Sequence, residues 1–406
     1  MLSFFINILF FYIFDKKKNS TKTMKRITSI DVVRGIVMVI MALDHIRDFL
    51  LQNALTQSPT DLTNTYPALF FTRWITHLCA PTFVFLSGVS AYISVKRQDN
   101  IGESRKFLLT RGVWLIFLEF SIISFGIWSD IGFHTFLFQV IAAIGVGFIL
   151  LSFLVGKSHK IALGLGSFIM LFYGLLILVP ESSLKATLSP FFVLTVLPFG
   201  SRLLILAYPI IPWWSIMLLG YGLGEYFLVE KPDRISFFMK MASGFLVTFV
   251  VLRFINHYGD PVAWSTQKTS FYTFLSFLNV SKNAPSLSFT LCMLGIAFTL
   301  LWLIEKYGNA KLKFFKIFGS VPLFYYLIHW YLIRVFLIII FLAKGYHWGD
   351  FVFNEQTLGR PKNDDGITLP QVYLAWFAVI LIMYPICKWY SNYKKQHPEK
   401  TWLRYL

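Results

Sequence analysis

The chain has 406 residues, of which 56% are hydrophobic and only 14% are charged, and its mean hydropathy is +0.63. A soluble globular protein carries about 25% charged residues, so this composition excludes a series of ordinary soluble domains. The net charge of +17 would suit binding to nucleic acid, but membrane proteins also collect lysine and arginine in their cytoplasmic connections. We therefore predict an all-α polytopic membrane protein, folded as one bundle, with no nucleic-acid partner.

Apolar runs long enough to cross a bilayer occur about ten times along the chain. One span needs about 20 mainly apolar residues. The predicted transmembrane helices are, in chain order, Ile30–Leu51, Leu69–Val95, Phe107–Ser129, Gly132–Val155, Ile161–Val179, Arg202–Leu228, Ile235–Asn256, Ser286–Ile304, Phe318–Ala343 and Gln371–Tyr390.

The distribution of lysine and arginine predicts the orientation of these spans. The N-terminal segment, every second connection and the C-terminal segment together hold 25 basic residues, whereas the alternate connections hold six. Because basic connections stay in the cytoplasm, both termini are predicted to be cytoplasmic in a multi-pass protein of the cell membrane. One missed or invented span would scramble this alternation, so the pattern supports the number ten.

The two ends of the chain are set apart from the predicted membrane domain. Met1–Phe14 is apolar but too short to span comfortably, and it lacks the small-residue cleavage site of a signal peptide. We interpret residues 1–23 as a non-native extension before a start at Met24, and a weak interfacial helix is the alternative. Residues 24–395 then form the transmembrane domain, and residues 396–406 form a cytoplasmic tail.

Two of the outer connections, residues 257–285 and 344–370, exceed the usual length. Long structured connections often carry function. The first contains the apolar run Phe271–Leu278, which we predict to lie on the membrane surface. The second is polar and contains Asp364 and Asp365, and we interpret it as a flexible cover.

The first predicted span carries an unusual number of ionisable side chains. They form two layers, one near each end of the helix: Asp31 and Arg34, then Asp44, His45, Arg47 and Asp48. Ionisable groups inside a membrane are costly and usually face a cavity or each other. A functional site and a structural cluster of ion pairs are both compatible with this pattern.

Arg34 and His45 lie eleven residues apart, which places them on one face of a helix and about 16 Å apart along its axis. This distance is close to the reach of a pantetheine arm. An arginine at the cytoplasmic mouth suits a phosphate group, and Asp31 is a candidate to pair with it. A histidine deeper in the membrane suits general-base chemistry, and Asp44 is a weaker candidate to orient its ring.

Further polar residues occur in later spans. Arg73 and His77 are four residues apart and share a helix face. Pro81 follows them and should loosen the helix, which frees carbonyl groups to line a cavity. His329 lies in the middle of the ninth predicted span.

A glycine-rich segment and the cysteines indicate no nucleotide loop and no metal. Gly220 and Gly224 are not preceded by a strand, so their spacing favours close packing between helices over a nucleotide loop. The sequence contains neither zinc-ligand spacing nor a Walker motif, and we predict no metal.

Three sequence blocks resemble a known family. Arg34 and His45, with ten residues between them, on a span that opens Ser29-Ile30-Asp31-Val32-Val33-Arg34-Gly35, resemble the membrane acyltransferase superfamily. Within it, the blocks Cys79–Gly88 and Tyr208–Trp213 resemble the heparan-α-glucosaminide N-acetyltransferase catalytic-domain family. The resemblance extends over nearly the whole chain from Met24.

The resemblance implies transfer of an acetyl group from cytosolic acetyl-CoA to an acceptor at or across the membrane. The heparan-specific branch has a histidine after the first span, where this chain has Pro67, and tends to have asparagine at the position of His45. The resemblance therefore implies the chemistry of the wider superfamily, with His45 as the base, and does not imply heparan as the acceptor.

We therefore predict an acyl-CoA-dependent membrane acyltransferase that uses acetyl-CoA as co-substrate, contacts membrane lipid and acetylates a hydroxyl or amine of a sugar or other small molecule. The candidate residues are His45, Asp44, His77 and His329 for catalysis, Arg34 and Asp31 for the donor, and Arg47, Asp48 and Arg73 for the acceptor. Direct transfer and an acyl-histidine intermediate both remain open, as do a monomer and a homo-oligomer. The alternative functions are a transporter or flippase and a non-catalytic scaffold.

Overall fold

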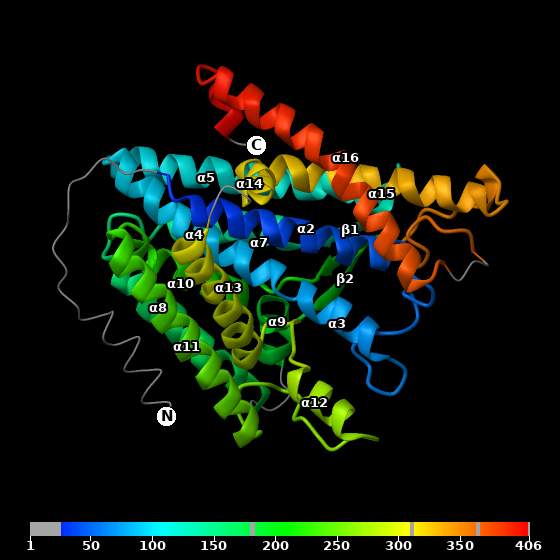
Figure 1. Cartoon of the computed structure of the whole chain (residues 1–406), viewed down its shortest axis with the longest axis horizontal. Helices are drawn as coiled ribbons and strands as arrows, with labels where there is room; N and C mark the ends of the chain where they lie inside the picture. Colours follow the sequence, from blue (N-terminus) through cyan, green and yellow to red (C-terminus); the bar gives the residue numbers. More distant parts are fainter. Residues whose placement is uncertain (1–25, 179–182, 309–311, 363–365, 405–406) are drawn as a thin grey trace.

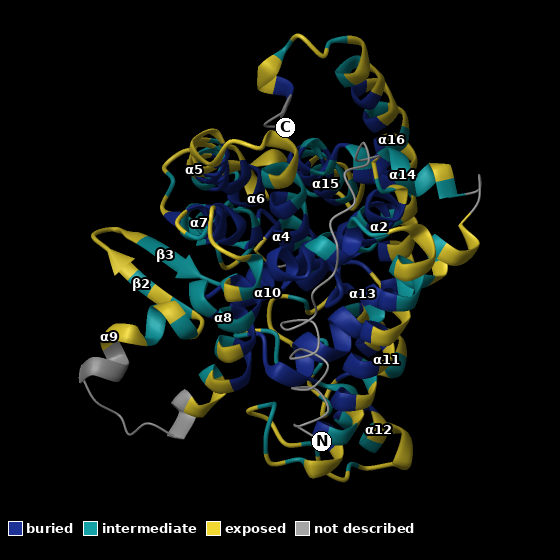
Figure 2. Cartoon of the chain, turned by 90° about the vertical axis from the view of Figure 1, so that its left-hand side faces the viewer, coloured by how far each residue is buried: buried dark blue, intermediate teal, exposed yellow. Residues whose placement is uncertain are grey.

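The computed structural model describes residues 26–178, 183–308, 312–362 and 366–404. The predictions for residues 1–23 and for Asp364 and Asp365 lie outside the described residues. The described chain is mostly helical, and α2 (Thr28–Leu50) runs through the middle of the helices in Figure 1, where it packs against α3, α4, α13, α14, α15 and α16. Buried residues concentrate around α2, α4, α10 and α13, whereas α9, α12 and the β2–β3 hairpin are largely exposed (Figure 2).

The remaining elements follow one another along the chain with short connections. The helices are α3 (Pro67–Thr76), α4 (Cys79–Gln98), α5 (Ile101–Leu118), the π-helical turn Glu119–Ile123, α6 (Ser124–Trp128), α7 (Val140–Ser152), α8 (His159–Phe172), α9 (Ser183–Phe192), α10 (Ile210–Gly222), α11 (Lys231–Ile255), α12 (Ser270–Leu278), α13 (Leu287–Tyr307), α14 (Lys313–Ser320), α15 (Pro322–Ala343) and α16 (Leu369–Gln396). The 3-10 helices are Tyr173–Leu178, Gly224–Phe227, Trp348–Asp350 and Thr401–Arg404, and the strands are β1 (Thr135–Phe138), β2 (Thr195–Phe199) and β3 (Arg202–Leu206).

Six helical segments of the described chain are long and apolar enough to cross a membrane. They are Pro67–Gln98, Ile101–Trp128, Lys231–Ile255, Leu287–Tyr307, Pro322–Ala343 and Leu369–Gln396. Helix α2 matches the predicted first span within two residues, but its aspartates and arginines make it too charged to join this group. The number ten and the cytoplasmic termini remain predictions.

The prediction of an all-helical chain is wrong in two of the predicted spans. The runs 132–155 and 202–228 begin with strands β1 and β3, and their helices α7 and α10 have 13 residues each, a length of about 20 Å. Strand β3 lies in the middle of a three-stranded sheet, parallel to β1 and antiparallel to β2. An apolar run gave no sign of this change, because a strand and a helix buried on all sides have the same composition.

Glycines allow two pairs of helices to touch backbone to backbone. A Cβ at Gly220 would lie 2.0 Å from the carbonyl oxygen of Phe85, and one at Gly88 would lie 2.1 Å from that of Met217. Helices α4 and α10 therefore cross in direct contact, which confirms the predicted packing role of Gly220. Gly224 likewise faces Tyr92, whose Cβ would be 2.5 Å from an added methyl group.

Helix α2 makes the same kind of contact with α14. A Cβ at Gly35 would lie 1.8 Å from the carbonyl oxygen of Phe315, and one at Gly319 would lie 1.7 Å from that of Asp31. Neither carbonyl can move without its helix, so each site excludes every larger residue.

Replacing Gly319 with alanine should therefore destabilise the protein by about 3 kcal/mol, because α14 must separate from α2 to admit the methyl group. The matched control is Gly164→Ala in α8, where an added Cβ meets nothing within 4 Å and the higher helix propensity of alanine should leave stability equal or slightly raised. Thermal unfolding of both variants in detergent measures the difference. Equal midpoints for the two variants would contradict the backbone contact.

The two long outer connections are folded against the helices. The predicted surface segment at 271–278 is helix α12, and the buried guanidinium of Arg253 donates hydrogen bonds to the carbonyl groups of Ser276 and Phe277, both at 2.9 Å. In the second connection, Arg360 is buried and donates to the carbonyl oxygens of Phe49 and Leu51 at 2.7 and 3.0 Å. This connection caps the end of α2, so the interpretation as a flexible cover is wrong for its described part.

Candidate functional site

Two histidines from distant parts of the chain form a hydrogen-bonded pair in the core. Nδ1 of His45 on α2 lies 2.7 Å from Nε2 of His329 on α15. The His45 ring also stacks on the indole of Trp330, with 4.0 Å between ring centroids and 18° between planes. His329 is fully buried, at 0% exposed surface, whereas His45 is partly exposed. The pair is therefore closed on one side and open on the other.

Hydrogen bonds define which nitrogen of His45 is free. Nδ1 of His329 lies 2.6 Å from the carbonyl oxygen of Tyr326, and a carbonyl can only accept, so this nitrogen donates. In the neutral ring, Nε2 of His329 must then accept the Nδ1 proton of His45. Nε2 of His45 consequently carries a lone pair, and it has no hydrogen-bond partner among the described residues. A base oriented in this way is suited to remove a proton from a bound group.

Asp44 lies next to His45 in the chain but has other partners. Its carboxylate accepts hydrogen bonds from Arg73 at 2.6 and 2.7 Å and from the Thr76 hydroxyl at 2.7 Å. It also pairs with Arg47 at 2.8 Å. The hypothesis that Asp44 orients the His45 ring is therefore wrong, because adjacent residues on a helix point in different directions. The orienting partner is His329.

The open side of His45 faces a cavity of about 390 Å³, which we call the His45 cavity. Its polar lining includes Asp44, His45, Arg73, Gln139, Tyr208 and Lys282. Apolar residues such as Met41, Phe83 and Trp330 complete the wall. A lining of this kind can hold a polar molecule against the free nitrogen of His45 while the apolar wall limits the access of water.

Arg34 lines a second cavity of about 270 Å³, the Arg34 cavity, together with Arg111 and three serines, Ser87, Ser90 and Ser94. The Arg34 guanidinium donates to the carbonyl oxygen of Leu86 at 3.0 Å and to the hydroxyl of Ser90. The predicted pairing with Asp31 is wrong, because Asp31 accepts from Arg26 at 2.6 Å instead.

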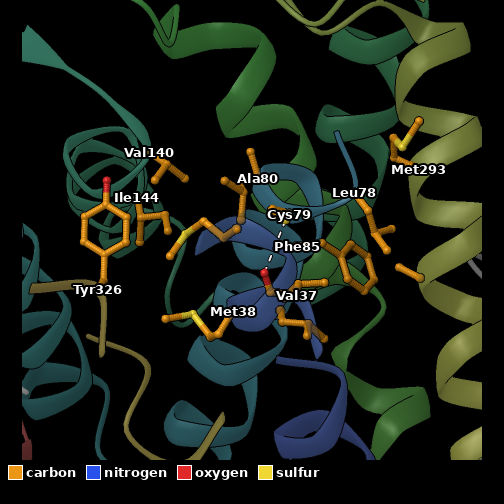
Figure 3. Packing of buried hydrophobic residues seen from close by; sticks show 14 of the residues in the cluster. Val37, Met38, Leu78, Cys79, Ala80, Phe85, Val140, Ile144, Met293 and Tyr326 are labelled. Carbon is orange, nitrogen blue, oxygen red and sulfur yellow. Dashed lines mark hydrogen bonds between the residues drawn. The ribbon is translucent and has the colours of Figure 1, made fainter. Parts of the chain in front are cut away.

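Arg34 and His45 thus face neighbouring cavities and not one common tunnel. The two cavities share three wall residues, Phe83, Val140 and Tyr326. Figure 3 shows Tyr326 beside Val140 and Ile144, and the Tyr326 hydroxyl has no hydrogen-bond partner among the described residues. A wall made of a few side chains separates the arginine from the histidine.

A third cavity, of about 370 Å³, adjoins the His45 cavity and is called the Arg47 cavity here. Its lining includes Arg47, Asp48, Arg73, His77 and Lys282, and three of these, Asp48, Arg73 and Lys282, also line the His45 cavity. The structure therefore gathers all three predicted acceptor residues beside the histidine pair.

His77 lies at a break between two helices, as Pro81 predicts. Helix α3 ends at Thr76 and α4 begins at Cys79, and Pro81 has no N–H to donate to the His77 carbonyl. Nδ1 of His77 is buried without a hydrogen-bond partner in the described chain. Its ring lies in the Arg47 cavity and does not line the His45 cavity, so it is separated from the histidine pair.

Lys282 is the residue of this site that the sequence did not single out. It lies in the long outer connection before α13, where only the length of the connection pointed to function. No group of three His, Cys, Asp or Glu side chains within the described ranges could share a metal ion.

The fold and the site together define a membrane protein with a buried proton-accepting centre between polar cavities. The family model described as heparan-alpha-glucosaminide N-acetyltransferase, catalytic, matches residues 26–253, more than half of the chain. The chain belongs to this family, and it is a membrane enzyme of the acetyltransferase type. No curated protein matches the chain. The matched region contains Arg34, His45, Arg73 and His77 and ends before Lys282 and His329.

Proposed function

We propose that the protein is an acyltransferase of the cell membrane that moves an acetyl group from acetyl-CoA to a hydroxyl or amine of a sugar or another small acceptor. The observation that supports this best is the free Nε2 of His45, fixed by the His329 pair at the wall of a polar cavity. A transporter needs no such oriented base, whereas acyl transfer does.

The donor enters, in this proposal, through the Arg34 cavity. Arginine binds phosphate oxygens with two parallel, charge-assisted hydrogen bonds, and Arg34 keeps donors free of its two contacts to Leu86 and Ser90. The pantetheine arm of acetyl-CoA would extend along α2 toward the wall that contains Tyr326, and the acetyl group would reach the His45 cavity there.

The acceptor binds in the His45 cavity with its hydroxyl or amine against Nε2 of His45. Nε2 removes the proton as the acceptor oxygen or nitrogen bonds to the carbonyl carbon of the thioester. We assign the Tyr326 hydroxyl as the donor to the developing oxyanion. The carbon–sulfur bond then breaks, and His45 returns the proton to the departing thiolate. An acetyl-histidine would use the same lone pair, and acid-quenched protein that retains label would distinguish this route.

The test is incubation of the purified protein with radiolabelled acetyl-CoA and a membrane extract, followed by identification of the labelled product. Label should move to a small molecule or glycan in a time-dependent manner. Uptake of a labelled solute into proteoliposomes without any consumption of acetyl-CoA would instead establish a transporter and overturn the proposal.

Replacing Arg34 with glutamine should raise the KM for acetyl-CoA about tenfold, because a hydrogen bond to a charged phosphate is lost, and should leave kcat nearly unchanged. Lys106→Gln is the matched control, since Lys106 is exposed on the neighbouring helix α5 and does not line the Arg34 cavity. Initial rates over a range of acetyl-CoA concentrations measure both constants. An unchanged KM in Arg34→Gln would remove Arg34 from donor binding.

A further inference from the structure

The charges around the two outer cavities do not balance. Arg47, Arg73 and Lys282 supply three positive charges, and Asp44 and Asp48 supply two negative ones. Both carboxylates are engaged by the arginines, Asp44 with Arg47 and Arg73, and Asp48 with Arg47. Lys282 has no carboxylate within 4.0 Å in the part of the chain that the structure describes, so its charge is left for a ligand.

Two further side chains of the Arg47 cavity hold donors without partners. Arg47 is 1% exposed, and its Nε and Nη1 make no hydrogen bond among the described residues. His77 is 5% exposed, and its Nδ1 is equally unpartnered. A buried donor left without an acceptor costs about 1–3 kcal/mol. Such groups side by side indicate a ligand that supplies acceptor oxygens.

The loop that carries Lys282 is held in place by the neighbouring chain. The carboxylate of Asp260 accepts hydrogen bonds from the backbone N–H of Ser281 at 3.0 Å and from its hydroxyl at 2.9 Å. Ser286 donates to the same carboxylate at 2.5 Å. Asp260 is thereby occupied with serine donors, so it anchors the loop without neutralising Lys282.

We infer that the Arg47 cavity binds an oxyanion group, a carboxylate, sulfate or phosphate, carried by the acceptor whose hydroxyl or amine lies against His45. The two cavities share Asp48, Arg73, Lys282 and Asn283 as wall residues, so one molecule can occupy both. The acceptor class is therefore an acidic sugar or another acidic small molecule. Naming the ligand as the acceptor rests on the proposed function, whereas the anion site does not.

Binding of inorganic sulfate to the full chain in detergent tests the site independently of catalysis. The rise of the unfolding midpoint with sulfate concentration, at constant ionic strength in chloride, gives the dissociation constant. Lys282→Met should raise this constant about tenfold, because one charge-assisted contact is lost. Lys268→Met, which removes an exposed lysine of the same outer connection, should bind sulfate like the unchanged protein. Equal constants for both variants and the unchanged protein would overturn the site.

The pH dependence of sulfate binding gives a second readout. Burial, and then the positive charge of Arg73, lower the pKa of Lys282 to about 8, while Asp44 and Asp48 act in the opposite direction. Arg47 and His77 face the same cavity. Because the cationic form binds the anion, sulfate affinity should fall as the pH rises from 7 to 9.5. Lys282→Arg keeps its charge over this range, so its affinity should stay constant. A fall of the same size in Lys282→Arg would contradict the assignment.

Competition separates an acceptor site from a site for a free anion. A sugar acid should displace sulfate and accept label from acetyl-CoA, and the neutral sugar with the same ring should do neither as well. If sulfate binding depends on Lys282 but no acidic acceptor is acetylated, the anion site stands and the proposed function fails. If a neutral acceptor is acetylated with the same KM in Lys282→Met, and its acidic counterpart is no better a substrate, the proposed function stands and the acidic acceptor is excluded.

Discussion

Replacing His45 with alanine should lower kcat/KM for acetyl transfer about 1000-fold, the usual cost of losing a positioned general base. The loss should appear mainly in kcat, because His45 acts on the proton of the acceptor while Arg34 and Lys282 provide binding. Stopped assays with labelled acetyl-CoA and a saturating acceptor measure it. Acetyl-CoA should still protect the variant against thermal unfolding, which shows that the fold and the donor site persist.

The control for this result is His134→Ala. His134 is an exposed histidine bonded to Asp130 at 2.9 Å, far from the histidine pair in its contacts, and its removal should leave activity intact. A folded His45→Ala variant with full activity would remove His45 from the mechanism.

The partner histidine permits a finer comparison. His329→Gln keeps an oxygen that can accept the Nδ1 proton of His45, whereas His329→Leu leaves that proton without an acceptor. The glutamine variant should therefore retain more kcat than the leucine variant, with equal KM values for acetyl-CoA. Equal losses would show that His329 contributes packing and not orientation.

Replacing Asp44 with asparagine should destabilise the protein by about 3 kcal/mol or more, because two guanidinium groups lose the charge that compensates them. Arg73 makes two hydrogen bonds to this carboxylate, and Arg47 pairs with it at 2.8 Å. The expected result is a large fall of the unfolding midpoint in detergent, together with loss of the defined shape of both outer cavities and hence of sulfate binding.

Asp48→Asn is the matched control for Asp44. Asp48 binds the same arginine, at 2.5 Å, but 45% of its side chain is exposed, so water replaces much of the lost interaction and the effect should stay below about 1 kcal/mol. If the two variants have the same stability, the buried position of Asp44 has no energetic weight.

The sequence was informative where one local pattern determines the structure. The length of the apolar run and its flanking charges gave the bounds of α2 within two residues. The spacing of Asp44 and Arg47 gave their ion pair, and the spacing of Gly220 and Gly224 gave a close helix contact. In each case the partners are neighbours on one helix or the smallest residue marks the point of contact.

The sequence was less informative where distant segments meet. His45 and His329 are 284 residues apart, and no local spacing relates them. Asp44 seemed a plausible partner for His45 only because the two are adjacent in the chain. Lys282 lies in a loop, and only the folded chain reveals that the carboxylates around it are already paired. Strands β1 and β3 were hidden because apolar residues fit a buried strand as well as a buried helix.

The contact of Gly35 and Gly319 determines how this molecule can work. Two rods that touch through their main chains, with no side chain between them as a cushion, cannot slide past each other without a collision of carbonyl groups. Helix α2 is thus a fixed rail, and the imidazole that it carries does not travel across the bilayer. The two reactants must come to that imidazole from opposite ends, and any gate belongs to the small wall of Phe83, Val140 and Tyr326 that lies between them.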